Sequence, residues 1–281
     1  MANVRALRAC GRLNVTQATS PRLSWSSSSV IADGTMALDR LLEGFAKFRV
    51  GYYRDHPELF KRLATEGQSP KILIIGCADA RVDPGILTQT RPGDIFTVRN
   101  IAAMVPPAQI PPDQAQHGTS AAIEFAVRGL EVEHVVILGH ALCGGIAALV
   151  DGESSAYAHY DYVSTWTAVA RTVRDVAVHD LAGRPREQIV RAVEQAAVVN
   201  SVANLMTFPW LAERVSAGKL VLHAWWFNLT EGQLYAFNAD NATFEPVKGI
   251  AVNPTVQQGT RLSAIKPERL LLALADKKPA F

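Results

Sequence analysis

Two apolar runs, each ending in glycine and followed at once by a motif that contains cysteine, constrain the fold of this chain most. Residues 72–76 read ILIIG and precede the motif CADAR at 77–81, while residues 135–139 read VVILG and precede HALCG at 140–144. Uninterrupted apolar runs of this length are typical of strands buried on both faces of a parallel sheet. Because open α/β sheets place their sites where parallel strands end, we expect the two motifs to lie close together.

Three side chains in these motifs, Cys77, His140 and Cys143, form a ligand set for zinc. Zinc prefers thiolate and imidazole ligands, and the His-x-x-Cys spacing lets both side chains reach one ion from the turn after a strand. Three protein ligands leave one tetrahedral position open, which is typical of a catalytic rather than a structural site. Taken singly, each residue reads as an ordinary buried side chain, but together they predict one zinc ion per chain.

Asp79 and Arg81 follow Cys77 directly in the first motif. The Asp79 carboxylate has two available states: it can take the fourth zinc position itself, or it can pair with Arg81 and accept a proton from water on the metal. The alternative is an ordinary surface ion pair. Two thiolates and a neutral imidazole leave zinc formally uncharged, so its water should ionise less readily than at a site of three histidines. We therefore expect an activity that rises above neutral pH.

The rest of the sequence predicts an α/β fold with a central, mostly parallel β-sheet flanked by helices. Residues 95–98 add a strand, and residues 220–227 and 233–237 read as a hairpin at the sheet edge. An N-terminal helical arm begins at Met36 and continues through residues 57–63. We expect residues 36–281 to form a single domain. The apolar positions expected on helix faces are Leu38, Leu41, Leu42, Phe45 and Phe48 in the arm, Ile123, Val127 and Leu130 in a central helix, and Val190, Val193, Val198, Val202 and Leu205 in a long helix before the hairpin.

Residues 1–35 differ in composition from the rest, with arginines but no acidic residue before position 33 and a serine-rich stretch at 24–29. This composition is typical of a mitochondrial or plastid transit peptide. The alternatives are a disordered leader, or upstream sequence translated from a misassigned start. The chain has 3 cysteines, too few for a disulfide framework, and Cys10 is left over once Cys77 and Cys143 serve as thiolates, which indicates a reducing compartment. We expect a cytoplasmic protein, or a mitochondrial or plastid one if the leader is a transit peptide.

Several partner and cofactor classes are not expected. A net charge of +2 without a basic block gives no reason for a nucleic-acid partner. No apolar run approaches the roughly 20 residues that a membrane helix requires, so we expect no membrane association. Cys77 and Cys143 are not the Cys-x-x-Cys pair of a redox protein, and residues 139–145 lack the Gly-x-Gly-x-x-Gly spacing of a dinucleotide site.

The pattern Cys-x-Asp-x-Arg followed by a distant His-x-x-Cys resembles the β class of carbonic anhydrases. Three further segments agree with this resemblance: GQSP at 67–70, GDIFTVRN at 93–100 and EFAV at 124–127. The similarity extends over residues 36–237 and is strongest over 66–146. It implies the reversible hydration of CO2 to bicarbonate and a proton, by attack of zinc-bound hydroxide at an ion held by Cys77, His140 and Cys143.

The resemblance also implies roles for the residues around the metal. Asp79 and Arg81 would form the gating and orienting pair, Gln68 would hydrogen-bond the substrate, and Phe96 would line the apolar CO2 pocket. Without the resemblance, Gln68 reads as a loop residue and Phe96 as core packing. We also place Gly144 among the substrate-binding residues. The basic unit of the family is a dimer with its sites near the interface, so we expect a homodimer or a higher homo-oligomer.

Four residues depart from the family pattern. Ala80 and Ala141 stand where serine is common, Ala103 replaces a frequent asparagine, and Phe125 lacks the hydroxyl of the tyrosine found in plant-like members. These changes bear on the rate and on the hydrogen bonds around the metal. Two other functions stay open: a hydrolase of carbon disulfide or carbonyl sulfide, whose substrates are linear and apolar like CO2, and a non-catalytic zinc protein that senses bicarbonate.

Overall fold

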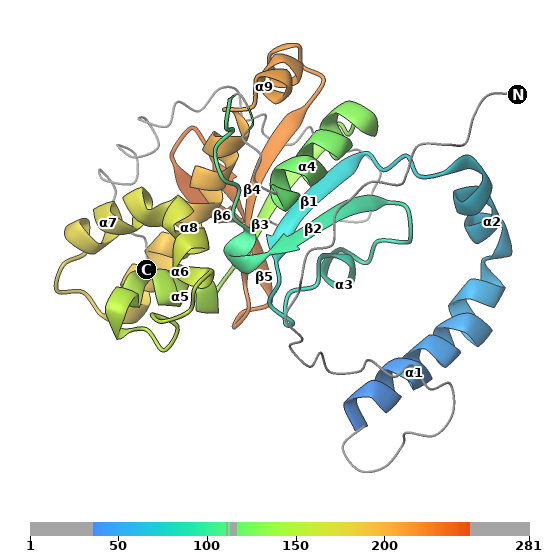
Figure 1. The fold of residues 1–281 in the computed structure, drawn as a ribbon, viewed down its shortest axis with the longest axis horizontal. Helices are drawn as coiled ribbons and strands as arrows, with labels where there is room; N and C mark the ends of the chain where they lie inside the picture. Colours follow the sequence, from blue (N-terminus) through green and yellow to red (C-terminus); the bar gives the residue numbers. More distant parts are fainter. Residues whose placement is uncertain (1–35, 111, 113–116, 248–281) are drawn as a thin grey trace, which may run out of the picture. The chain divides into compact units, whose positions relative to one another are not determined.

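The computed structural model describes residues 36–110, 112 and 117–247, so the leader and Cys10 lie outside the described residues. The described chain falls into two compact units that divide between Lys61 and Arg62. The first unit is the helical arm that the sequence predicts, with α1 (Met36–Phe48), a π-helical turn (Arg49–Tyr53) and the start of α2 (Pro57–Glu66) (Figure 1). The single domain over residues 36–281 stays a prediction.

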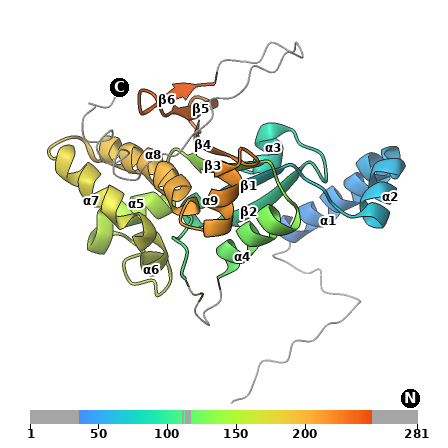
Figure 2. The ribbon, with the colours of Figure 1, turned by 90° about the horizontal axis from the view of Figure 1, so that it is seen from above.

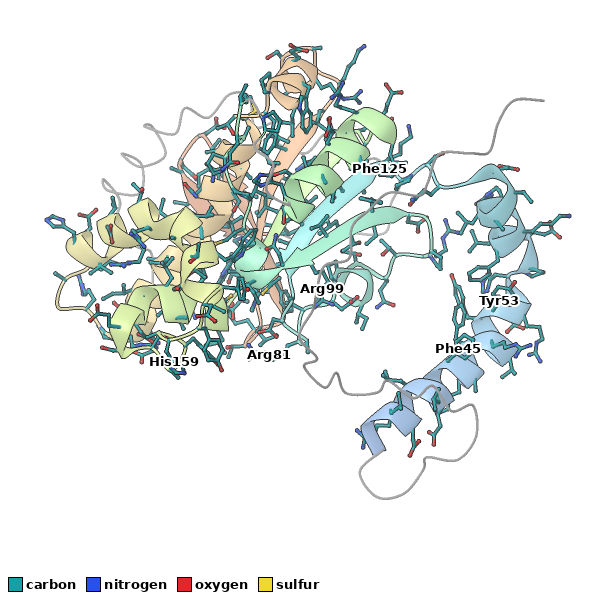
Figure 3. All side chains as sticks on the ribbon, in the orientation of Figure 1. Phe45, Tyr53, Arg81, Arg99, Phe125 and His159 are labelled. Atoms are coloured by element: carbon teal, nitrogen blue, oxygen red, sulfur yellow. The ribbon has the colours of Figure 1, made fainter. Side chains whose placement is uncertain are left out.

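The arm has an exposed apolar face. An aromatic cluster forms its junction, where the Phe60 ring lies 4.6 Å from the ring of Tyr53 and 5.8 Å from that of Phe48, centroid to centroid. The Phe45 ring adjoins this cluster, 6.5 Å from that of Phe48 between centroids, and Figure 3 labels it on α1. The large apolar residues of α1 that are more than half exposed are Leu38, Leu41, Leu42 and Phe45.

A six-stranded sheet forms the centre of the second unit, in the order β2-β1-β3-β4-β5-β6. The first four strands in this order are parallel, whereas β5 and β6 are antiparallel to their neighbours. The mostly parallel sheet and the hairpin β4–β5 are confirmed. The short edge strand β6 was not expected, because its four residues are too few to show an alternating pattern. The strands run over Ile72–Cys77 (β1), Ile95–Asn100 (β2), His134–His140 (β3), Val221–Asn228 (β4), Gln233–Asn238 (β5) and Thr243–Pro246 (β6).

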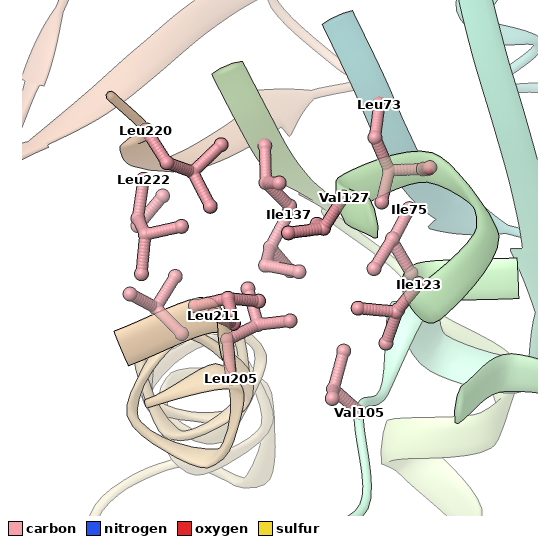
Figure 4. Packing of buried hydrophobic residues seen from close by; sticks show 14 of the residues in the cluster. Leu73, Ile75, Val105, Ile123, Val127, Ile137, Leu205, Leu211, Leu220 and Leu222 are labelled. Carbon is pink, nitrogen blue, oxygen red and sulfur yellow. The ribbon is translucent and has the colours of Figure 1, made fainter. Parts of the chain in front are cut away.

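Helices cover both faces of the sheet (Figure 2). On one face, α4, α8 and α9 contribute Ile123, Val198 and Leu211 to a continuous buried cluster (Figure 4). On the other face, Leu87 of α3 packs against the cluster that contains Ile74 of β1. Of the helices described, none is both long and apolar enough to cross a membrane. The helices run over Pro84–Thr88 (α3), Gly118–Glu124 (α4, continued by a π-helical turn over Phe125–Gly129), Gly144–Asp151 (α5), Val163–Thr167 (α6), Arg171–Asp180 (α7), Arg186–Leu205 (α8) and Pro209–Ser216 (α9), with short 3-10 turns at Ile101–Ala103, Gly152–Ser154 and Ala168–Ala170.

Gly139 allows α8 to approach β3 closely. A Cβ atom at this position would lie 2.3 Å from Cγ2 of Val198, well inside van der Waals contact, so a larger residue fits only if Val198 moves. The apolar positions predicted on the inner face of α8, from Val190 to Leu205, are buried. The glycine that ends the second apolar run of the sequence therefore sets the spacing between this helix and the strand beneath it.

Two histidines face each other on β3 and β4. Nδ1 of His134 lies 3.1 Å from Nε2 of His223, which allows one hydrogen bond between the rings only while at least one ring is neutral. Burial and, to a smaller extent, the nearby His134 lower the pKa of His223 from its ordinary 6.5 to about 4. His223 is therefore a neutral side chain in the folded protein at neutral pH.

This pair predicts a loss of stability in mild acid. The unfolded chain binds a proton at His223 near pH 6.5, whereas the folded chain resists it until about pH 4, so the unfolding free energy falls as the pH drops through this window. We expect His223→Phe to reduce this fall by roughly 1 kcal/mol per pH unit. Urea unfolding of both proteins at several pH values measures the difference, and parallel declines would contradict the prediction.

Candidate metal centre

The parallel pairing of β1 with β3 brings the two motifs together, as the sequence predicts. Gly76 pairs with Leu138, so Cys77 and His140 emerge at the same edge of the sheet. Cys143 follows as the N-cap residue of α5. One ligand atom from each of Cys77, His140 and Cys143 lies within 4.8 Å of the other two, and all three residues are buried.

The His140 ring is oriented with one nitrogen toward the sulfur atoms. Its Nδ1 lies 2.8 Å from the carbonyl oxygen of Ala141, and because a carbonyl only accepts, Nδ1 donates this hydrogen bond. In the neutral ring, Nε2 then carries the free lone pair. Nε2 is buried and has no hydrogen-bond partner among the described residues. A buried acceptor without a donor is costly, and a cation held between this nitrogen and the two sulfurs would satisfy it.

The side chains of Cys77 and Cys143 are in contact with each other. Their Sγ atoms are 4.0 Å apart. The contact with Cys143, together with His140 and the Asp79 amide, lowers the pKa of Cys77 to about 4 despite burial. The same contact and burial raise the pKa of Cys143 above its ordinary range, although the amides of Gly145 and Ile146 act against this. A bound dication would favour the thiolate form of both cysteines, so the donor set of two sulfurs and one imidazole nitrogen fits zinc.

The carboxylate of Asp79 is held beside the cluster by Arg81. Asp79 Oδ2 accepts a hydrogen bond from Nη2 of Arg81 at 2.7 Å, and Oδ1 accepts one from Nε at 2.9 Å. These bonds keep the pKa of Asp79 well below its usual range. Oδ2 also lies 3.9 Å from Nε2 of His140. Of the two states expected for Asp79, the structure shows the one in which the carboxylate pairs with arginine.

Further contacts fix the two turns that carry these groups. Nη2 of Arg81 also donates to the carbonyl oxygen of Leu142 at 3.0 Å, which joins the first motif to the second. Arg99 donates to the carbonyl oxygens of Cys77 and Asp79 at 2.9 and 2.7 Å, and Figure 3 shows it next to Arg81 at this edge of the sheet. The sequence pattern does not single out Arg99, because the contacts depend on β2 lying beside β1.

A buried carboxylate hydrogen-bonds to the backbone of the second turn. Glu194 of α8 is 4% exposed, and its Oε1 accepts a hydrogen bond from the backbone amide of Cys143 at 3.0 Å. Burial raises the pKa of Glu194 to about 7, although the amides of Cys143 and Leu142 lower it. The sequence contains a signal for this residue, since Glu194 falls four residues after Val190 and four before Val198, on the inner face of the helix.

Phe96 and Gln68 do not reach this centre within the same chain. Phe96 pairs with Leu73, four residues before the level of Cys77, which places it about 13 Å away along the strand. The Phe96 ring packs against Phe125, 5.7 Å between centroids, and Phe125 lies well away from Arg81 in Figure 3. Gln68 is exposed in the segment before β1.

Gly144, by contrast, lies directly beside the cluster. It follows Cys143 as the first residue of α5, and a Cβ atom there would meet nothing within 4 Å. Open space therefore adjoins the ligand Cys143 on this side. The structure thus brings together six of the eight residues singled out for the site: Cys77, Asp79, Arg81, His140, Cys143 and Gly144.

Comparisons with known proteins agree with this geometry. A family model described as "Carbonic anhydrase" matches residues 72–234, which includes both motifs. The chain belongs to the β-carbonic anhydrase family. The chloroplastic β carbonic anhydrase 5 of Arabidopsis thaliana is 33% identical to it over 83% of this chain and 77% of the plant protein.

Two solved β-carbonic anhydrases share the fold. The structure of CcaA is 32% identical in sequence and superposes with a TM-score of 0.69, covering 74% of this chain and 98% of CcaA. One of two tetrameric β-carbonic anhydrases from the ascomycete Sordaria macrospora is 30% identical, with a TM-score of 0.62 over 72% of this chain and 97% of the fungal protein. Family and fold therefore agree with the cysteine–histidine–cysteine cluster.

The cluster predicts how zinc will bind. We expect one zinc ion per purified chain, and less than about a tenth of that in Cys77→Ser or Cys143→Ser, because loss of one thiolate removes a ligand from a three-ligand site. Elemental analysis of dialysed protein measures the content. Cys10→Ser is the matched control and should retain full zinc. Full occupancy in Cys143→Ser would contradict this ligand assignment.

Proposed function

We propose that this protein catalyses the reversible hydration of CO2 to bicarbonate and a proton at a zinc ion held by Cys77, His140 and Cys143. The observation that carries the proposal is the buried cluster of two thiols and an imidazole next to a carboxylate that an arginine holds. Membership of the carbonic anhydrase family supports this reaction. When bound, zinc would supply a Lewis acid that lowers the pKa of water below its value in bulk solvent.

Asp79 and Arg81 position the reaction. Because Arg81 binds both carboxylate oxygens of Asp79, the carboxylate stays ionised and is kept from the fourth metal position. In this position beside Arg81, the Asp79 carboxylate accepts a hydrogen bond from the attacking water and so directs the oxygen lone pair at the carbon of CO2. The open space beside Gly144 leaves room for the product. The Arg81 side chain is 49% exposed, so the released proton has a short route to buffer.

The proposed reaction predicts a specific pH profile. We expect the kcat of CO2 hydration to rise from about pH 6.5 to about pH 9, because two thiolates neutralise the charge of the cation and leave it a weaker acid than a site with three histidines. Stopped-flow hydration with zinc-loaded protein measures it. Cys143→Ser should be inactive, and Arg81→Ala should lose about 100-fold because Asp79 is then free to move.

A second arginine–aspartate pair supplies a matched control. Arg186 binds both carboxylate oxygens of Asp151 at 2.6 Å, at the far end of α5 from Cys143. Arg186→Ala removes the same kind of ion pair and should leave kcat within about twofold. An inactive wild-type protein that holds one zinc per chain would overturn the proposal, and would leave hydrolysis of a sulfur-containing substrate or bicarbonate sensing in its place.

We further propose a homodimer in which each copy completes the site of the other. Gln68, Phe96 and Phe125 lie far from Cys77 in their own chain, yet Phe125 is 51% exposed and Gln68 is also exposed. A two-fold axis can place this patch of one copy over the metal edge of the other. The exposed apolar face of α1 supports self-association, as does similarity to tetrameric fungal enzymes.

Complementation between two impaired variants tests this dimer. Cys143→Ser destroys the metal site and Gln68→Ala the patch, so each homodimer should have low activity. Random re-association gives mixed dimers in which one site has both elements intact, and about a quarter of wild-type activity should return. Stopped-flow assays follow the activity, and native mass spectrometry confirms the mixed dimer. Mixed dimers without restored activity would contradict the shared site.

A further inference from the structure

The turn that delivers Cys143 contains a backbone conformation that few side chains adopt. Leu142 has a φ of 59°, in the left-handed region, which is unfavourable for a residue with a Cβ atom. Packing of the Leu142 side chain does not explain this conformation, because the residue is 61% exposed. Such strained positions persist only where surrounding contacts hold them. The contacts that hold this turn are therefore part of how Cys143 is placed.

The hydrogen bonds on this turn come from two directions. Arg81 donates to the Leu142 carbonyl oxygen, and Glu194 accepts from the Cys143 amide on the buried side. Arg81 is half exposed and is shared with Asp79, so it can move with the carboxylate. Glu194 sits on α8, where Gly139 and Val198 are in close contact one helical turn away. The buried acceptor is the rigid one of the two.

We propose that Glu194 is a positioning residue for the metal centre: its carboxylate oxygen, by accepting the Cys143 amide, holds the strained Leu142–Cys143 turn and so fixes the Cys143 sulfur. The inference rests on the proposed zinc site but concerns the chain itself. Two features argue against simple packing. The position lies in line with Val190 and Val198, where an apolar residue would be the cheaper choice, and the carboxylate bonds backbone rather than another side chain.

Two substitutions of similar size separate the hydrogen bond from the volume. Glu194→Gln keeps an acceptor oxygen, whereas Glu194→Met fills the space without one, and both residues favour helices. Removing a buried ionisable group also removes its desolvation cost, so we expect both variants to fold. Far-ultraviolet circular dichroism and thermal unfolding check that they do.

Zinc release and amide exchange give the decisive readouts. We expect Glu194→Met to release zinc to a chelator about tenfold faster than wild type, and Glu194→Gln to stay within about threefold. In the metal-free proteins, hydrogen exchange of the peptide that contains the Cys143 amide should be about tenfold faster in Glu194→Met and unchanged in Glu194→Gln. Rescue by glutamine is the signature of an acceptor, since a loss of packing alone would not discriminate between the variants.

The outcomes distinguish the two proposals. Equal zinc release and equal exchange in wild type and Glu194→Met would overturn the positioning role, and so would a glutamine variant as impaired as the methionine one. If the wild-type chain bound no zinc, the proposed function would fail, while the exchange comparison would still decide the role of Glu194. If Glu194→Met did not fold, a rapidly exchanging Cys143 amide in wild type would overturn the inference.

Discussion

Parallel pairing between β1 and β3 is the constraint on which the rest of the site depends. Their register brings Cys77 and His140 out at one edge of the sheet, and the turn after β3 returns Cys143 to the same point. Neither strand could be shifted by one residue without sending its side chains to the opposite face. The apolar core therefore specifies the candidate metal centre indirectly, because burial of both strands fixes the register that brings Cys77 and His140 together.

Charge is distributed around this centre in opposing pairs. Two buried sulfurs lie 4.0 Å apart, and the carboxylate of Asp79 next to them is kept ionised by Arg81, which lowers its pKa. Arg81 also donates a hydrogen bond to the backbone of the second motif. The guanidinium that holds Asp79 is therefore also in contact with the turn that carries Cys143. Arg99 and Glu194 fix the same two turns from the neighbouring strand and helix. The site thus consists of three candidate ligands and a larger set of side chains that hydrogen-bond to the backbone of the two turns.

Much of this could be predicted from local sequence. Apolar runs identified the two central strands, and the residues that follow them identified the cluster, because strand ends are set by short-range pattern. Glu194 and Arg99 were not predicted, since their partners are backbone groups that become neighbours only after the sheet and α8 are assembled. The resemblance that implies a role for Phe96 does not indicate where it lies: β2 places it four residues from the level of Cys77, and only the register of the strands reveals this.

Gly139 has no functional group, yet its close contact with α8 bears on the candidate metal centre. Its missing side chain sets how deeply α8 settles on β3, and Glu194 is carried on that helix one turn from the point of contact. A side chain at position 139 would press on Val198 of that helix, and any shift of the helix that followed would change the distance between the Glu194 carboxylate and the Cys143 amide. A substitution in the core could then change the position of Cys143 through α8 and Glu194. Packing of the interior and the geometry of the candidate metal centre are therefore coupled in this protein.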